Sequence, residues 1–185
     1  MRTVLIIKPG AGGEESIDFA RMLKDMYMGW AERHKMLSSA LKEKDNSWVV
    51  TLGSDSDTLE DMEQERGVHR LVRISPFDRQ SRRHTSFASV DIEGAKELED
   101  KTSFGPRARN YVLYPYQQAM DFRKNYTTDK VFDVLAGGVE LDAMRAAAKD
   151  MFALADNKGQ VVGHIEHRTL TQEEMDHALT LKPTI

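Results

Sequence analysis

The chain has 185 residues, of which 40% are hydrophobic and 30% are charged, a balance typical of one compact globular domain with a real core. It contains no cysteine, which excludes disulfides and thiolate metal sites and fits a reducing cytoplasm. No apolar run reaches the roughly 18 residues that a membrane helix needs, so we predict a cytoplasmic protein without membrane contact. The net charge of −4 argues against a protein that coats nucleic acid nonspecifically.

The first third of the chain predicts a strand followed by an amphipathic helix. Residues 4–7 form an apolar run that suits a buried strand, and residues 9–13 are rich in turn-forming Pro and Gly. Glu14 and Glu15 then lie where the first turn of a helix favours negative charge. Large apolar side chains follow at spacings of four, three and four, which predicts one buried stripe: Phe19, Leu23, Met26 and Trp30.

The middle of the chain predicts further strands. Residues 48–52 (WVVTL) indicate a second strand, and residues 58–65 indicate a short acidic helix in solvent. Residues 69–74 and 85–92 alternate in polarity, which predicts a strand pair joined by a loop. Pro76 stiffens that loop because its ring fixes the backbone angle φ.

The later half is predicted to be mostly helical. An apolar segment at residues 111–116 ends in a proline turn, and Thr128 or Asp129 is placed to cap the next helix. Residues 140–155 repeat apolar side chains on one helical face. The last predicted elements are a strand and a short helix, over residues 161–167 and 171–179. We therefore predict an α+β fold: a small mixed β-sheet packed against helices, with a helical C-terminal half.

The most informative stretch of the sequence is residues 66–86. Six arginines stand there against one acid, Asp78, and two histidines and one phenylalanine lie among them. Because guanidinium groups neutralise phosphate and aromatic rings stack on bases, this composition is that of a site for unpaired RNA. The alternative is a solvated, arginine-rich strand pair, and composition alone leaves both open.

The order of three motifs in this stretch resembles a known family. GVHR, SPF and RRHTS, which begin at residues 67, 75 and 82, resemble the codon-reading domain of bacterial peptide chain release factors, most of all the type that reads UGA and UAA. The Gly-rich turn before Glu14 and the run FGPRARNYVLYPYQQAMDFR from residue 104 are similar to further parts of that family. The resemblance covers roughly residues 4–155.

Two parts of the family's pattern have no counterpart here. The family releases the nascent chain with a GGQ loop on a separate catalytic domain, and this sequence contains no GGQ. That domain looks excised near residues 93–101, and the family's N-terminal helical domain has no counterpart either. The resemblance therefore implies a codon-recognition domain at residues 1–159, a C-terminal extension at residues 160–185, and no enzymatic activity.

The resemblance also implies a role for each motif residue. Ser75 is expected to hydrogen-bond the second base of a stop codon, with Pro76 and Phe77 shaping the loop beside it. His84 is expected to stack between the second and third bases, and Thr85 to bond the third base. These roles suit the chemistry, because a hydroxyl donates or accepts one hydrogen bond and an imidazole plane stacks on any base.

Val72, in the strand before SPF, is expected to lie against the third base. The arginines expected to contact phosphates of messenger or ribosomal RNA are Arg70, Arg73, Arg79, Arg82 and Arg83. The motif residues also have ordinary structural interpretations. Ser75 could cap the turn, Phe77 could fill the core, and His84 could be a surface residue.

The implied function is binding to the ribosomal decoding centre at a stop codon in mRNA, without hydrolysis of peptidyl-tRNA, so that the chain modulates or competes with termination. Its partners would be the ribosome, through the rRNA of the small subunit, and mRNA. The family reads the first base with a segment that corresponds here to residues 41–52, which are short by several residues. Two alternatives follow: an RNA-binding protein that protects an mRNA off the ribosome, or a codon-reading subunit for a separate GGQ-bearing protein.

Other chemistry has little support in the sequence. The histidines of the segment 164–167 (HIEH) are three residues apart, so on a strand they would face opposite sides and not share a metal. The glycines of residues 10–13 lack the Lys-Ser/Thr pair of a phosphate-binding P-loop. We therefore predict no cofactor, no metal and no small-molecule substrate.

Overall fold

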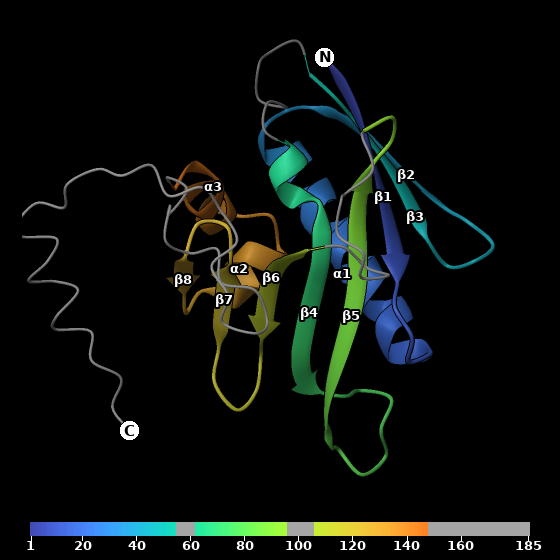
Figure 1. Cartoon of the computed structure of the whole chain (residues 1–185), viewed down its shortest axis with the longest axis vertical. Helices are drawn as coiled ribbons and strands as arrows, with labels where there is room; N and C mark the ends of the chain where they lie inside the picture. The colour runs from blue at the N-terminus through green and yellow to red at the C-terminus, as the bar shows by residue number, and fades with distance from the viewer. Residues whose placement is uncertain (55–61, 96–105, 148–185) are drawn as a thin grey trace, which may run out of the picture.

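The structure is a computed structural model that describes residues 1–54, 62–95 and 106–147. These residues form one eight-stranded mixed sheet with a long helix on one face, which is an α+β architecture (Figure 1). The predicted fold class is therefore confirmed, although the sheet is larger than expected. Within these described ranges, no helix is long and apolar enough to cross a membrane.

The described chain begins with one strand and the long helix α1, continues mostly as strands, and ends with two short helices. In chain order they are β1 (Arg2–Pro9), α1 (Glu14–Arg33), β2 (Leu37–Lys42), β3 (Trp48–Gly53), the 3₁₀ turn η2 (Met62–Glu65), β4 (Gly67–Ile74), β5 (Arg83–Ile92), β6 (Arg107–Val112), β7 (Gln118–Asp121), β8 (Tyr126–Thr128), α2 (Val131–Leu135) and α3 (Val139–Ala146).

The strands lie in the order β2-β3-β1-β5-β4-β6-β7-β8. All neighbouring strands are antiparallel except β4 and β6, which run parallel. The central pair, β4 and β5, stays in register from Gly67 opposite Val90 to Ile74 opposite Arg83. Their connecting loop projects beyond the end of the sheet (Figure 1).

The core lies between α1 and one face of the sheet. The predicted apolar stripe of this helix is confirmed, since Phe19, Leu23 and Met26 are fully buried and Trp30 is nearly so. Alternate strand residues meet this stripe, because successive side chains of a strand point to opposite faces. They include Leu5, Val50, Leu71, Ala88 and Tyr111. The sheet therefore has a covered face under α1 and an opposite face, which we call the open face.

The turn between α2 and α3 packs directly on α1. Gly137 has a φ of 72°, and a Cβ atom there would lie 2.3 Å from the backbone oxygen of Met26. Only glycine fits both the left-handed conformation and this close approach. The indole of Trp30 completes the contact by donating a hydrogen bond to Asp142 at 2.8 Å.

The prediction of a helical C-terminal half is wrong for residues 107–128, which form β6, β7 and β8. The sequence of β6, RARNYV, carries charge at a position that the fold buries, and its Arg109 side chain is neutralised by partners far away in the chain. The helix expected from Thr128 or Asp129 begins only at Val131. Thr128 instead accepts a hydrogen bond from the backbone N–H of Lys130, which forms the turn before α2.

Several other predictions have a partial outcome. Strand β2 was not predicted, because its sequence LSSALK is exposed and lacks an alternating apolar pattern. Only the end of the expected acidic helix is described, as η2, and its Glu65 is buried rather than solvated. The predictions for residues 58–61, 96–105 and 148–185 lie outside the described residues, and these include most of the expected excision and the whole C-terminal extension.

Candidate nucleic-acid interface

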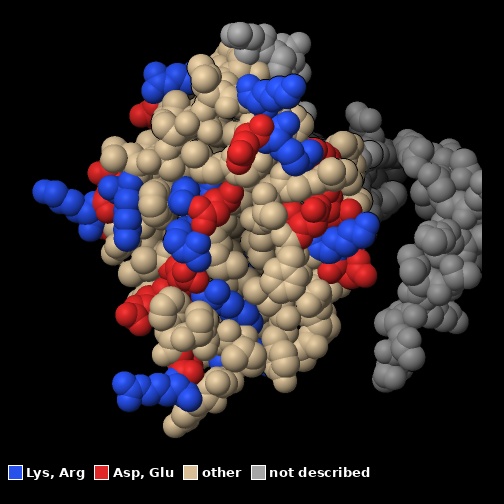
Figure 2. All heavy atoms as spheres, turned by 180° about the vertical axis from the view of Figure 1, so that it is seen from behind, with Lys and Arg blue, Asp and Glu red and all other residues tan. Residues whose placement is uncertain are grey.

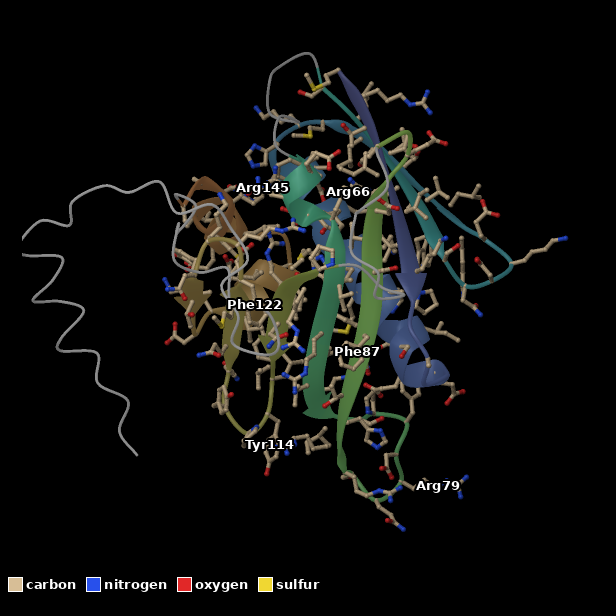
Figure 3. All side chains as sticks on the ribbon, viewed as in Figure 1. Arg66, Arg79, Phe87, Tyr114, Phe122 and Arg145 are labelled. Atoms are coloured by element: carbon tan, nitrogen blue, oxygen red, sulfur yellow. The ribbon has the colours of Figure 1, made fainter. Side chains whose placement is uncertain are left out.

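The residues singled out in the sequence gather at the free end of the β4–β5 hairpin. Residues 75–82 form its loop, called here the SPF loop, which is closed by a hydrogen bond of 3.0 Å from the Ser75 N–H to the Arg82 carbonyl. Arg79 lies at the tip of this loop, and Tyr114 marks the neighbouring β6–β7 loop at the same end of the molecule (Figure 3). Loops at the end of a rigid sheet are common positions for binding residues.

Ser75 anchors the SPF loop to the first turn of α1. Its hydroxyl donates a hydrogen bond of 2.5 Å to Glu15 and accepts one of 3.2 Å from the Phe77 N–H. Ser75 is only 4% exposed, so its hydroxyl lies where the loop leaves the sheet rather than on the loop surface. One acceptor position of this oxygen remains unused by these two bonds.

Asp78 organises the other half of the SPF loop. Its carboxylate accepts hydrogen bonds from Arg82 Nε and His84 Nε2, both at 2.7 Å, and from the Gln80 N–H at 2.9 Å. The bonds from Arg82 and His84 hold the pKa of the Asp78 carboxyl well below its usual range. The imidazole of His84 is therefore fixed in direction while 41% of its side chain stays exposed.

Arg73 lies on the covered face and not among the exposed arginines. Its guanidinium bonds Glu15 and Asp18 of α1, each at 2.7 Å. Burial raises the pKa of Asp18, but the hydrogen bonds from Arg73 and Arg21 outweigh burial and lower it overall. The structure thus commits Arg73 to holding α1 on β4, which differs from the predicted contact with phosphate. Figure 2 shows this side of the molecule, where acidic and basic side chains are interspersed.

Val72 and Thr85 lie directly opposite each other on the open face. Together with residues of the neighbouring strands they line a shallow hollow of about 130 Å³, which holds no acid: Arg70, Val72, Arg83, Thr85, Val112, Pro115 and Tyr116. Val72 and Thr85, which the resemblance assigned to the third base, are therefore neighbours. The guanidinium groups of Arg70 and Arg83 line the same hollow.

A third arginine, Arg107, lies near Arg70 and extends the basic surface beside this hollow. Burial and the nearby charge of Arg70 lower the pKa of Arg107, whose guanidinium lies 5.4 Å from the centre of the Phe122 ring. Phe87 lies on the same face, opposite Arg70 in the strand register, and is 37% exposed (Figure 3). Aromatic rings beside arginines are the combination that binds unpaired nucleotides.

The remaining loop residues are exposed. Pro76, Arg79 and Arg83 face solvent, and the Phe77 ring, which was expected to shape the loop, is 47% exposed rather than in the core. Phe77 borders a second hollow of about 210 Å³, together with Glu14, Ile17, Asp18, Arg21, Lys42 and Trp48. This hollow lies between the start of α1, the β2–β3 hairpin and the SPF loop, and its lining mixes both signs of charge.

The predicted residues thus divide between two sides of one hairpin end. Ser75 and His84 lie toward α1, whereas Val72 and Thr85 lie on the open face. Within the described ranges, no cluster of three His, Cys, Asp or Glu side chains could hold a metal ion.

Three acids position these residues, and the sequence did not single them out for that role: Glu15, Asp18 and Asp78. Glu15 and Asp18 are three apart at the start of α1, so they share one helical face, and both bind Arg73. Asp78 is the single acid in an arginine-rich stretch, which indicates that its carboxylate pairs with neighbouring basic side chains. Glu15 and Asp78 thus fix the SPF loop directly, whereas Asp18 fixes Arg73 of the strand before it.

Comparison with known proteins gives this geometry a family context. Residues 1–90 match the model of the PCRF domain. The chain is 45% identical over 121 residues to peptide chain release factor 2 of Helicobacter pylori strain J99, covering 63% of this chain and 32% of that protein. It is 47% identical over 97 residues to the release factor 2 of Renibacterium salmoninarum, covering 48% and 25% respectively.

This chain is therefore similar to release factors in its PCRF-domain region, residues 1–90. It spans about a third or less of the length of these curated relatives. Among solved structures, RF2 of Thermus thermophilus superposes with a TM-score of 0.63 and 21% identity, over 77% of this chain and 66% of that one, which shows a common fold. The matched residues 1–90 include α1, the whole SPF loop and β5 as far as Val90, whereas Val112, Pro115 and Tyr116 of the open-face hollow lie beyond them.

Proposed function

We propose that this chain binds the decoding centre of a bacterial-type ribosome, at or near a stop codon, through the end of its β4–β5 hairpin. The observation that carries the proposal is the His84 imidazole at the start of β5, which is 41% exposed and is held in place by Asp78 of the SPF loop, beside exposed arginines. A stacking ring that is already oriented loses little entropy on binding, which favours recognition of unpaired bases.

The hydrogen bonds of Ser75 support a narrower role than the resemblance implies. Because its hydrogen is donated to Glu15, the Ser75 oxygen offers a base an acceptor rather than a donor. A base with an exocyclic amino group meets that requirement, and adenine and guanine both carry one. Pro76 and Phe77 would then shape the wall of the loop on which this base rests.

On the open face, Val72 and Thr85 would receive the next base in the hollow described above. The arginines proposed to bind RNA phosphates are Arg70, Arg79, Arg82 and Arg83. Arg73 is left out of this set because its side chain is only 12% exposed and bonds both Glu15 and Asp18, whereas Arg82 is 67% exposed and bonds one acid. Phosphate contacts of this kind supply affinity that falls as salt concentration rises.

The test is binding of the purified chain to 70S ribosomes programmed with a stop or a sense codon in the A site. We expect salt-sensitive binding that is tighter on the stop codon, and loss of about tenfold in affinity for His84→Ala, since base stacking on an aromatic ring is worth about 1–3 kcal/mol. His34→Ala is the matched control, because His34 also bonds an aspartate at 2.8 Å but lies at the far end of α1. Equal binding of wild type and His84→Ala would contradict the proposal.

Asp78→Asn is predicted to reduce discrimination between stop and sense codons by roughly three- to tenfold, with little change in thermal stability. The asparagine keeps the size of the side chain, but it no longer offers a charged acceptor to both Arg82 and His84. Nitrocellulose filter binding with the two programmed ribosomes measures the ratio. Glu63→Gln, which alters an exposed acid elsewhere, should leave that ratio unchanged.

We also propose that the chain binds without hydrolysing peptidyl-tRNA. Only residues 93–106 connect β5 to β6, where the family resemblance places the catalytic domain, and the sequence offers no GGQ. A GGQ-bearing protein acting in trans would supply hydrolysis if the chain serves as a codon-reading subunit. Release of labelled peptide from programmed ribosomes by the chain alone would contradict this proposal.

A second candidate function is binding of a specific RNA off the ribosome. The β2–β3 hairpin favours it, because β2 and β3 are joined by a short turn in which Glu43 N–H bonds Ser47 O, and this is the segment shortened relative to the first-base region of the family. Sedimentation of a cell extract separates the two functions. Co-migration with 70S particles supports the first, and recovery of one free RNA supports the second.

A further inference from the structure

One edge of the sheet carries two exposed leucines. Strand β2 is the outermost strand on that side (Figure 1), and it pairs on its inner side with β3. Leu37 is 83% exposed and Leu41 is 62% exposed, although most large apolar side chains of the described residues are in the core. The outer side of β2 presents backbone N–H and C=O groups that have no strand partner within the described chain.

Strand β2 lacks the features that usually prevent edge-to-edge pairing. It contains no proline, its register with β3 is continuous, and Lys42 at its end is its one charged residue. The opposite edge is different, because β8 is only three residues long. A six-residue, unbulged, weakly charged edge is the kind that accepts another strand.

We propose that two copies of this chain pair antiparallel through β2, with Ser39 on the two-fold axis. In that register Leu37 lies opposite Leu41 of the partner subunit, Ser39 opposite its own copy, and Lys42 does not face another Lys42. Leu37, Ser39 and Leu41 project from one face of the strand, so both leucine pairs form on the same face of a continuous sheet. A shift by two residues would place one leucine of each copy opposite Ser39 and the other opposite a residue outside β2.

The sequence of β2 favours a second copy over a different partner. On this face β2 carries leucine, serine and leucine, an order that is the same in both chain directions. Such symmetry is needed only when a strand pairs with a second copy of itself. Three strands, β3, β1 and β5, separate β2 from β4. Pairing at this edge therefore leaves the SPF loop accessible, and the inference holds whether or not the chain binds ribosomes.

Sedimentation velocity over a range of concentrations tests the pairing with two matched double variants. Leu37→Lys with Leu41→Lys puts like charges opposite each other, so the dissociation constant should rise at least about tenfold. Leu37→Lys with Leu41→Glu puts opposite charges in both pairs, and its constant should stay within about threefold of wild type. Both positions are exposed, and circular dichroism verifies that each variant is folded.

Cysteine substitution tests the register directly, because the chain has no cysteine of its own. Opposite residues of an antiparallel pair have Cα atoms about 4.5–5.5 Å apart, which suits a disulfide, so Ser39→Cys should crosslink the dimer under mild oxidation. The control Ser38→Cys places its two sulfurs on Cα atoms roughly 8 Å apart, beyond disulfide reach.

Three results would overturn the pairing. The first is a wild-type chain that stays monomeric up to about 100 µM, which would show no self-association at a useful affinity. The same conclusion holds if β2 takes up a strand of another protein instead. Equal crosslinking of Ser39→Cys and Ser38→Cys indicates random collision. Equal weakening by the two double variants shows that the leucines do not face each other.

Discussion

Replacing Glu65 with glutamine is expected to lower the free energy of unfolding by about 3–5 kcal/mol, the usual cost of removing one partner from a buried ion pair. Glu65 is fully buried just before β4. It accepts hydrogen bonds from Arg109 Nη1 and Nη2 at 2.7 and 2.9 Å, from Arg145 Nη1 at 2.8 Å and from the Tyr27 hydroxyl at 2.9 Å. Glutamine would leave both guanidinium groups short of negative charge.

The charges of this cluster balance each other inside the protein. Burial raises the pKa of Glu65, but the charges of Arg109 and Arg145 outweigh burial and hold it far below its usual range. Arg109 also donates a hydrogen bond of 3.0 Å to Asp121 of β7. The cluster therefore joins η2, β6, β7 and α3 at the base of the strand that carries the candidate interface.

Urea unfolding of wild type and Glu65→Gln at neutral pH measures the difference. Glu63→Gln is the matched control, since its carboxylate is 63% exposed and its pair with Arg66 is worth at most about 1 kcal/mol. A loss below about 1 kcal/mol for Glu65→Gln would mean that the buried cluster relaxes or takes up water when its acid is removed.

Local patterns were sufficient to predict the parts of the fold whose burial repeats with a fixed period. The stripe on α1 and the alternation of the β4–β5 hairpin are confirmed, since a single buried face imposes its period on the sequence. The motif order likewise indicated a resemblance to release factors, and the match of residues 1–90 to the PCRF domain agrees with that resemblance.

Long-range pairing was not predictable from local patterns. Arg109 is buried in β6 only because Glu65, 44 positions earlier, neutralises it, so a polar-looking strand was read as part of a helical half. Within the candidate interface, Arg73 was assigned to phosphate because its partners Glu15 and Asp18 are more than 50 residues away. Strand β2 was missed for the opposite reason, since an exposed edge needs no apolar alternation.

His69 is expected to make the protein acid-sensitive, with a loss of about 3 kcal/mol in stability between pH 6.5 and pH 4. The side chain is fully buried in β4. Its Nε2 lies 2.9 Å from the Glu65 carbonyl, which only accepts, so Nε2 carries the hydrogen and Nδ1 accepts from the Tyr111 hydroxyl at 3.0 Å. The neutral ring is thus fully bonded, and a second proton would add a buried positive charge close to that of Arg109.

Burial and the charge of Arg109 lower the pKa of His69 to about 4. A histidine in an unfolded chain has a pKa near 6.5, so between pH 6.5 and pH 4 the unfolded chain binds a proton that the folded chain does not bind. Stability is therefore unaffected above about pH 6.5 and falls as the pH drops toward 4. About 2 kcal/mol of the loss comes before pH 5, where carboxylates are still ionised and add little.

Denaturant unfolding at pH 7, 6, 5.5 and 5 measures this slope in wild type and in His69→Gln. Glutamine offers a donor and an acceptor in place of the two ring nitrogens but does not titrate, so the variant should lose most of the slope whatever its stability at pH 7. The comparison of slopes also separates His69 from exposed histidines such as His34, which both proteins retain. A wild-type stability that is flat from pH 7 to 5, or an unchanged slope in His69→Gln, would show that another group controls the acid response.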